Sequence, residues 1–272
     1  MSDSTVTRQV LICRQGLVQT AAGHVVRETP LTVRLGDREL VTLLTDGTHP
    51  DELAVGFLFN EGLLDEASQI RSVRVDEKRG EALIDAVVDE KLIDSVYGKR
   101  LVTSGCGKGR IFYHVLDAVK AGRVRVIGDL VLPLTFIYEI GASLAGTSDT
   151  YKRTRGVHGA ALLDNEGVVC FREDIGRHNA LDKLAGWSLR GPGIGRGMAL
   201  YTTGRVTSEV MLKAGRMRLP IILSRSMPTD MALQLAEQIG VTVVGGLRAG
   251  SCTIFTRPER IANAIPEPEG LP

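Results

Sequence analysis

The fold of this chain is decided by residues 198–245, which read MALYTTGRVTSEVMLKAGRMRLPIILSRSMPTDMALQLAEQIGVTVVG. Short apolar runs alternate here with helical patterns: the runs span 198–203, 220–224 and 241–245, and the helices begin near Ser208 and Thr229. Parallel strands need crossover connections, which are usually helices. The stretch therefore predicts a mostly parallel sheet covered by helices, that is, an α/β fold.

The segments around this stretch extend the prediction to the rest of the chain. Apolar runs at 160–163 and 168–171 predict two further strands, and a helix begins near Gly176. Residues 1–100 are β-rich, with hairpins predicted over 24–45 and 70–88 around one helix that begins near Pro50. We expect three parts: a β-rich N-terminal part over 1–100, a cysteine loop with connecting helices over 101–155, and an α/β core with a ligand-binding strand edge over 156–272.

Composition and charge narrow the classes of function. The 272 residues include 33 Lys and Arg against 32 Asp and Glu, which gives a net charge of +1. This balance argues against a dedicated nucleic-acid binder and against binding to an anionic membrane. The polar N-terminus has no apolar run behind it, so we expect neither a signal peptide nor a membrane span, and a cytoplasmic location.

Three of the four cysteines have apolar neighbours. Cys13, Cys170 and Cys252 follow or lie in apolar runs, and we expect all three to be packed. No cysteine of the sequence belongs to a Cys-x-x-Cys pair or stands at metal-ligand spacing from a histidine. We therefore expect neither a zinc site nor a disulfide framework.

Cys106 has a different setting. Residues 103–110 read TSGCGKGR, which places this thiol among three glycines and beside Lys108 and Arg110, ahead of a helical pattern. The reactive form of cysteine is the thiolate, and its pKa, near ~8.5 in the free residue, falls beside cations. Glycines also let a large partner approach the sulfur. Alternatively, Cys106 is only a small residue that fits a tight turn. The basic, glycine-rich setting favours a reactive thiol instead.

Polar sequences with one arginine each follow the three strands of residues 198–245. These arginines are Arg205, Arg225 and Arg248. Parallel strands bring their carboxyl ends to one sheet edge, where open α/β folds bind ligands, and arginine binds phosphate through paired hydrogen bonds. We therefore expect a phosphorylated ligand at this edge. Asp230, at a helix start, either accepts the paired N–H donors of a guanine or merely complements the helix dipole.

Two histidines and one further carboxylate are also candidates. His158 stands between Gly156 and Gly159 ahead of a strand, a setting that is consistent with ligand contact. His178 could act as a general base for a thiol, although a histidine in a first helical turn is more often a hydrogen-bonded structural residue. We expect Asp174 to cap the helix that follows it.

Several of these segments resemble the formate dehydrogenase accessory sulfurtransferase family, FdhD. The matching segments are residues 28–31, 50–58, 104–107, 156–160, 173–183 and 224–230. The resemblance implies a mixed α/β (α+β) fold with a cytidine deaminase-like three-layer core, a homodimer, and a cysteine that receives persulfide sulfur from a cysteine desulfurase. In this chain that cysteine is Cys106.

The resemblance also implies what receives the sulfur. It is the molybdenum of the bis(molybdopterin guanine dinucleotide) cofactor, Mo-bis-MGD, before insertion into the formate dehydrogenase apoenzyme, and a guanine nucleotide is a partial mimic of it. The cofactor site carries over to Gly246, Leu247, Arg248, Ala249, Gly250 and Ser251. Many relatives have Cys-x-x-Cys in the loop, whereas this chain has Gly109 in the second position, so Cys106 must act alone.

Three other functions compete with sulfur transfer. A zinc deaminase needs His-x-Glu and Pro-Cys-x-x-Cys, and the sequence contains neither. A non-catalytic chaperone would bind the molybdenum cofactor without sulfur chemistry at Cys106. A thiol hydrolase that combines Cys106 with His178 ranks below both, because the geometry between distant segments cannot be read from a sequence.

Overall fold

The computed structural model describes residues 4–89, 93, 101–102, 125–126, 128–195 and 197–264. The Cys106 loop and the helical pattern after it lie outside these residues. None of the described helices is long and apolar enough to cross a membrane.

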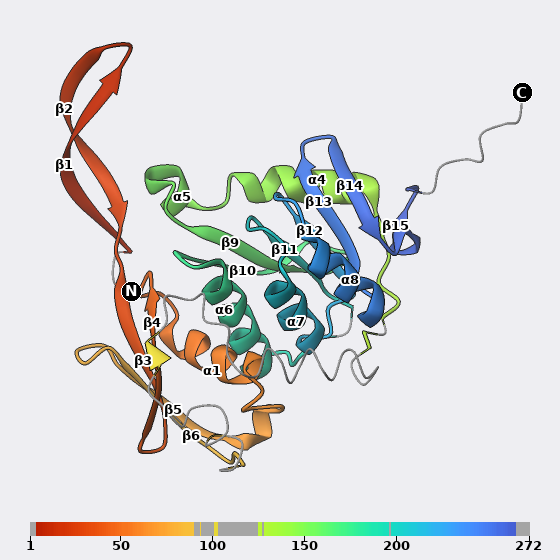
Figure 1. Ribbon diagram of the computed structural model, residues 1–272, viewed down its shortest axis with the longest axis horizontal. Helices are drawn as coiled ribbons and strands as arrows, with labels where there is room; N and C mark the ends of the chain where they lie inside the picture. The colour runs from red at the N-terminus through yellow and green to blue at the C-terminus, as the bar shows by residue number, and fades with distance from the viewer. Residues whose placement is uncertain are drawn as a thin grey trace, which may run out of the picture.

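A six-stranded sheet with the order β10-β9-β11-β12-β13-β14 forms the core (Figure 1). Its strands are β9 (His158–Leu163), β10 (Val168–Asp174), β11 (Ala199–Thr202), β12 (Ile221–Ser224), β13 (Thr242–Arg248) and β14 (Ser251–Thr256). Strands β11, β12 and β13 run parallel, but β9 is antiparallel to both of its neighbours and β14 is antiparallel to β13. The prediction of a mostly parallel sheet was wrong, because hairpins form both ends of the sheet.

Helices cover both faces of this sheet. On one face lie α6 (Arg177–Arg190), α7 (Ser208–Arg216) and α8 (Asp230–Ile239); on the other lie α4 (Leu134–Ala145) and, after it, α5 (Asp149–Thr154). Side chains alternate between the faces along a strand. In β11, Leu200 packs with the first group of helices and Tyr201 with α4. The predicted three-layer core is confirmed.

The N-terminal part is a smaller five-stranded sheet with the order β5-β6-β3-β4-β7. Its elements are β3 (Thr29–Leu35), β4 (Arg38–Thr45), α1 (Pro50–Asn60), the 3-10 turn η1 (Ala67–Gln69), β5 (Ile70–Asp76), β6 (Glu81–Ala86) and β7 (Leu101–Val102). Both predicted hairpins are present, although residues 24–26 belong to the strand β2 (Leu17–Val26) and not to the first hairpin. Near the C-terminus, the turn η2 (Pro258–Arg260) precedes β15 (Ile261–Ala262), which pairs with β8 (Leu132–Pro133).

Helix α1 lies between the N-terminal sheet and α6, and it is buried from residue 53 to residue 60. Two glycines allow the helices to touch through their backbones. A Cβ atom on Gly56 would lie 1.7 Å from the carbonyl oxygen of Asp182, and one on Gly186 would lie 1.9 Å from that of Glu52. Both distances are far below van der Waals contact, so only glycine fits at these positions.

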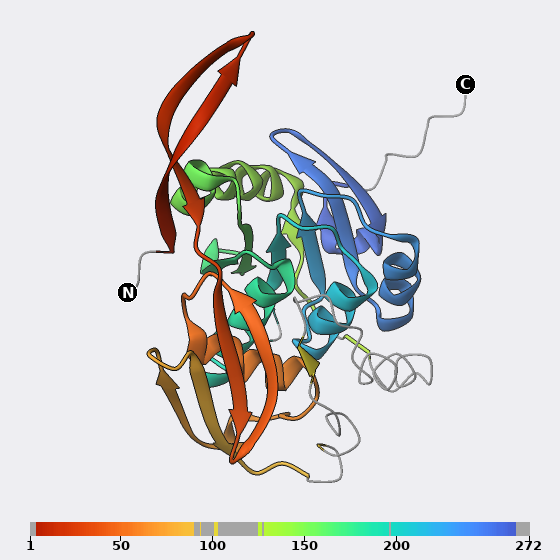
Figure 2. The same cartoon turned by 60° about the vertical axis from the view of Figure 1, so that its left-hand side comes forward.

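A hairpin of β1 (Thr5–Arg14) and β2 (Leu17–Val26) projects from the body as a separate arm (Figures 1 and 2). Leu11 and Leu17 are 69% and 78% exposed on it. Cys13 is exposed on the same arm, so the prediction that it is packed was wrong; an apolar run in a projecting hairpin is not covered by a second layer. Cys170 is buried and Cys252 partly buried, as predicted.

Candidate functional site

A cavity of about 440 Å³ lies at the edge of the core sheet where β11, β12 and β13 end, with α4 and α5 as its opposite wall. This volume is typical of small-molecule sites, which range over roughly 300–1,000 Å³. The polar and charged groups that could contact a ligand come from both walls: they are Ser148, Tyr151, Arg155, His158, Arg225 and Arg248.

Serine side chains tie the loops of this edge together. Ser224 Oγ donates a hydrogen bond to the carbonyl oxygen of Gly204 at 2.8 Å, and Ser226 Oγ donates one to that of Thr203 at 2.9 Å. Gly246 in β13 donates its N–H to the carbonyl oxygen of Ser226 at 3.1 Å. The loops after β11 and β12 and the end of β13 are thus held in one arrangement, which fixes the floor of the cavity.

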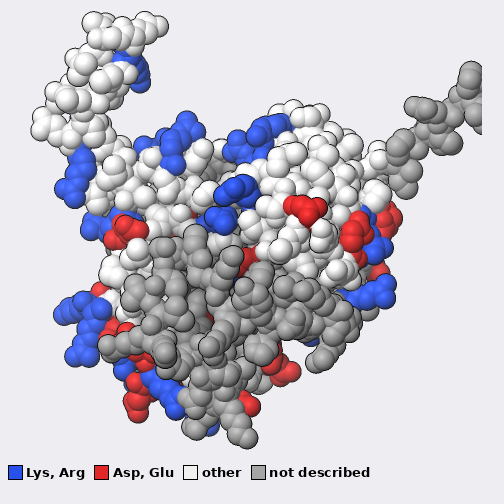
Figure 3. Space-filling view, viewed as in Figure 1, with Lys and Arg blue, Asp and Glu red and all other residues white. Residues whose placement is uncertain are grey.

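The cavity is strongly basic. Arg248 Nη1 donates to the carbonyl oxygen of Arg225 at 2.6 Å, which brings the two arginines together. Arg155 belongs to the opposite wall, at the end of α5. Its guanidinium lies 5.0 Å from the centre of the Tyr151 ring. No carboxylate is among the described residues that line the cavity. Figure 3 shows basic side chains gathered over α5 and the adjacent strand ends, an arrangement that suits an anionic ligand.

His158 lies in the wall of the cavity. Its Nδ1 is 3.5 Å from Thr203 Oγ1, and the side chain is half-buried. Burial lowers the pKa of His158, and the charge of Arg177 lowers it further. The ring is therefore neutral at pH 7 and can exchange hydrogen bonds with a ligand, but it adds no positive charge.

The structure brings two of the three predicted arginines together and leaves out the third. Arg205 is exposed and does not line the cavity, because the chain bends at residues 203–204 directly after β11. Asp230 is also exposed outside the cavity, and its Oδ2 accepts a hydrogen bond from Gln234 Nε2 at 2.8 Å. Arg155 takes the place in the cavity that was expected for Arg205.

The segment from Gly246 to Ser251 comprises the end of β13, the turn at Ala249 and Gly250, and the first residue of β14. Only Arg248 of this segment lines the cavity. Leu247 is buried in the core, whereas Ala249, Gly250 and Ser251 are exposed at the end of the hairpin. The segment thus offers the cavity one guanidinium, and its remaining side chains do not reach it.

Sequence reasoning missed the wall that α5 provides. Ser148 caps α5 by accepting a hydrogen bond from the N–H of Tyr151 at 2.7 Å, and Tyr151 and Arg155 follow on the same short helix and its C-cap. The serine and first-turn Asp149, followed by a basic run, are a helix start signal in the sequence. The signal predicts a helix, but it does not show that the helix lies beside the strand ends.

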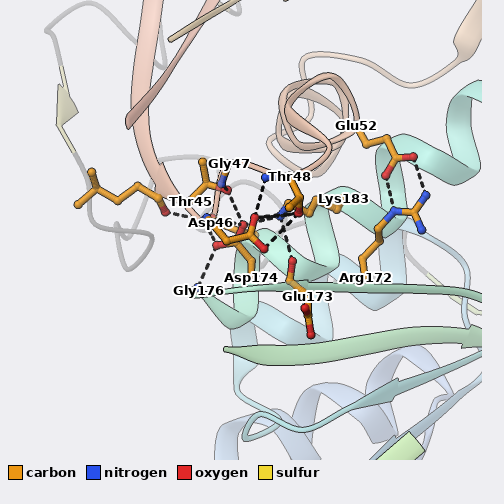
Figure 4. A network of polar contacts seen from close by, with 12 residues as sticks. Thr45, Asp46, Gly47, Thr48, Glu52, Arg172, Glu173, Asp174, Gly176 and Lys183 are labelled. Atoms are coloured by element: carbon orange, nitrogen blue, oxygen red, sulfur yellow. Dashed lines mark hydrogen bonds and ion pairs between the residues drawn. The ribbon is translucent and has the colours of Figure 1, made fainter. Parts of the chain in front are cut away.

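Behind the cavity, a buried ion cluster joins the core to the N-terminal part (Figure 4). Lys183 Nζ lies 2.6 Å from Asp46 Oδ1 and 2.6 Å from Asp174 Oδ2, and all three side chains are almost completely buried. The prediction that Asp174 caps α6 was wrong: the N-cap is Gly176, with no side-chain cap, because Asp174 pairs with Lys183. Beside this cluster Arg172 forms a two-pronged ion pair with Glu52.

His178 is buried in α6 and neutral. Its Nε2 lies 3.3 Å from Glu209 Oε2, but neither ring nitrogen has a hydrogen-bond partner among the described residues. Burial lowers the pKa of His178 to about 2, and nearby Lys213 and Arg177 contribute to the same shift. Its role as a base for Cys106 stays a prediction, since Cys106 lies outside the described residues.

We expect no zinc in this protein. The described residues contain no group of three or more His, Cys, Asp or Glu side chains arranged to hold a metal, and zinc sites need three or four such ligands. Metal analysis of protein purified without added metal should therefore find zinc well below one atom per chain. Stoichiometric zinc that survives dialysis against a chelator would contradict this expectation.

Comparison with known proteins supplies the family. The FdhD/NarQ family model matches residues 26–262. The chain is 40% identical over 257 residues to the sulfur carrier protein FdhD of Bacillus subtilis (strain 168), covering 94% of this chain and 97% of that one. It is 37% identical over 245 residues to the protein of the same name from Staphylococcus haemolyticus (strain JCSC1435), covering 90% and 92%.

A solved structure shows the same fold. It is the crystal structure of a protein from Desulfotalea psychrophila that is assigned as a formate dehydrogenase accessory protein. The two superpose with a TM-score of 0.80 at 30% sequence identity, over 95% of this chain and 100% of the other.

Proposed function

Because this chain belongs to the FdhD/NarQ family, we propose that it is a sulfur carrier that serves formate dehydrogenase. Cys106 receives the outer sulfur of a cysteine desulfurase persulfide, and the desulfurase leaves as its thiolate. The outer sulfur then passes to the molybdenum of Mo-bis-MGD, with the metal supplying the two electrons that reduce it to sulfide and Cys106 leaving as its thiolate. The sulfurated cofactor enters the formate dehydrogenase apoenzyme. The protein does this in the cytoplasm and as a homodimer.

The observation that carries the proposal is the basic cavity at the strand edge. A dinucleotide arm of Mo-bis-MGD presents phosphates, and Arg225, Arg248 and Arg155 line the cavity from two walls with no described carboxylate among them. Hydrogen bonds to charged groups contribute about 1.5–3 kcal/mol each, so three arginines would stabilise a bound diphosphate. The volume of about 440 Å³ suits one nucleotide arm of the cofactor.

A nucleotide titration tests this site. We expect GDP to bind, and Arg225→Gln to weaken binding at least about tenfold, since the variant loses a charge-assisted pair to phosphate. Isothermal titration calorimetry measures both constants. Arg218→Gln is the matched control, because Arg218 is an exposed arginine at the opposite end of the parallel strands, before β12. Equal losses in the two variants, or no binding by the wild type, would contradict the proposed phosphate site.

Guanine recognition is a separate expectation. We expect GDP to bind more tightly than ADP, because the cofactor carries guanine. If Asp230 reads the base, Asp230→Ala should make the two affinities equal while leaving ADP binding unchanged. A GDP preference that survives this substitution would remove the role from Asp230 and agree with its position outside the cavity.

A further inference from the structure

Tyr201 in β11 carries an unexplained polar atom. Its side chain is completely buried, in the part of the core that also contains Leu144 and Leu247. Its hydroxyl oxygen Oη has no hydrogen-bond partner among the described residues. An unpaired buried hydroxyl is destabilising, and buried side-chain polar atoms are paired in the large majority of cases. A phenylalanine would fill the same space without this cost, so the hydroxyl calls for an explanation.

The position of Tyr201 places this hydroxyl next to the basic cavity. Tyr201 packs against α4, which also contributes residues to the cavity wall, so its ring lies on the cavity side of the sheet. Thr203, the first residue after β11, lines the cavity. On the neighbouring strand, Tyr201 pairs with Leu223, two residues before the cavity residue Arg225. Leu144 belongs both to the core around Tyr201 and to the cavity wall. The ring therefore lies directly beneath the strand edge.

The electrostatics show what the hydroxyl can do there. Burial raises the pKa of Tyr201 to about 12, and the charges of Arg225 and Arg248 oppose this shift only in part. The hydroxyl therefore keeps its proton at neutral pH. Both guanidinium groups act on the phenol, and that of Arg225 also approaches Oη as a donor, but a guanidinium has no acceptor atom and cannot take the hydroxyl proton. A protonated hydroxyl beneath two cations is a donor that lacks an acceptor, and a bound anion would supply one.

We infer that Tyr201 Oη donates a hydrogen bond to the phosphate group that Arg225 and Arg248 bind. This inference rests on the proposed function and names a third, uncharged donor for its ligand. The arginines attract any anion, whereas the hydroxyl is held by the surrounding core beneath the residues that line the cavity, so only an oxygen that enters below the arginine side chains can meet it. Tyr201 thus distinguishes a phosphate seated deep in the cavity from an anion held at its mouth.

The test is Tyr201→Phe, which removes the hydroxyl and little else. We expect the dissociation constant for GDP to rise about tenfold, and that for inorganic pyrophosphate to rise similarly, because a hydrogen bond to a charged group is lost. We also expect the melting temperature to stay the same or increase, because the variant no longer buries an unpaired hydroxyl. Tyr138→Phe on α4 is the control, because the Tyr138 hydroxyl lies beside Cys252 and not beside the two arginines, and it should change neither constant.

The outcomes separate this inference from the proposed function. Unchanged affinity in Tyr201→Phe, whether or not the melting temperature falls, would overturn the inference while wild-type GDP binding still supports the phosphate site. If the wild type binds neither GDP nor pyrophosphate, both proposals fail. Repeating Tyr201→Phe in an Arg225→Lys background tests whether the hydroxyl acts only by placing Arg225. A persistent loss of affinity supports direct donation, and no further loss would overturn it.

Discussion

Replacing Cys106 with alanine is expected to abolish activation of formate dehydrogenase by this protein. A persulfide needs a sulfur atom to carry it, and Gly109 removes the neighbouring thiol that many relatives have in this loop. The buried cysteines are poor substitutes: burial raises the pKa of Cys170 to about 11 and also raises that of Cys252, so few of these thiols are ionised at neutral pH. Formate oxidation by the client enzyme should therefore fall to the level seen without the carrier.

Two controls make this result specific. The Cys106→Ala protein should bind GDP as the wild type does, since the cavity belongs to a different segment of the chain. Cys13 is the exposed thiol of the described residues, so Cys13→Ser should leave activation intact and show that an accessible thiol alone is not enough. Mass spectrometry after incubation with a cysteine desulfurase and cysteine should find the persulfide on Cys106. Full activation by Cys106→Ala would favour the cofactor-binding chaperone.

The second large effect is expected on stability. Lys183→Met should lower the free energy of unfolding by about 3–5 kcal/mol, the usual cost of removing one partner from a buried ion pair. Its ammonium group lies 2.6 Å from a carboxylate oxygen of both Asp46 and Asp174, so the variant leaves two buried carboxylates without a cation. Urea unfolding followed by circular dichroism measures the loss. Lys152→Met is the matched control, because the exposed pair of Lys152 with Asp149 contributes at most about 1 kcal/mol.

The loss of free energy of unfolding caused by Lys183→Met should depend on pH. Burial already raises the pKa of Asp46, and the charge of Lys183 opposes this shift in the wild type. Without the lysine the pKa in the folded state rises further above its unfolded value, so proton uptake favours the folded variant at low pH. The difference in free energy of unfolding between the variant and the wild type should therefore be smaller at pH 5 than at pH 8. A deficit that does not change with pH, or one equal to that of Lys152→Met, would contradict this account.

The elements of residues 156–245 could be predicted because the strands are visible as short apolar runs and the helices between them as helical patterns. The parallel order of β11, β12 and β13 then placed Arg225 and Arg248 at one edge, since that follows from connectivity alone. The third arginine could not be predicted in this way. Arg155 lies three residues before β9, and it reaches the cavity because α4 and α5 lie over the ends of β11, β12 and β13, a tertiary arrangement that no local pattern reports. The proposed boundaries of the three parts stay a prediction.

The environment of Cys13 and the antiparallel strand pairs also could not be predicted from local sequence patterns. An apolar run predicts a strand whether or not a second layer covers it, so the run around Cys13 could not reveal a projecting arm. Alternating strands and helices likewise leave strand direction open where a tight turn replaces a helix, as it does between β9 and β10. Whether a strand is covered, and in which direction it pairs, depends on the segment that packs beside it. That segment can be distant in the sequence.

The contact of Gly56 with α6 has a consequence for how this protein can vary. A side chain added at Gly56 or Gly186 would overlap a main-chain carbonyl oxygen, and the main chain is common to every amino acid. Most harmful substitutions in a core can be offset by trimming a neighbouring side chain. Here no second mutation can make room, because there is nothing to trim. Suppressor screens that start from Gly56→Ala should therefore return revertants to glycine and not compensating changes elsewhere.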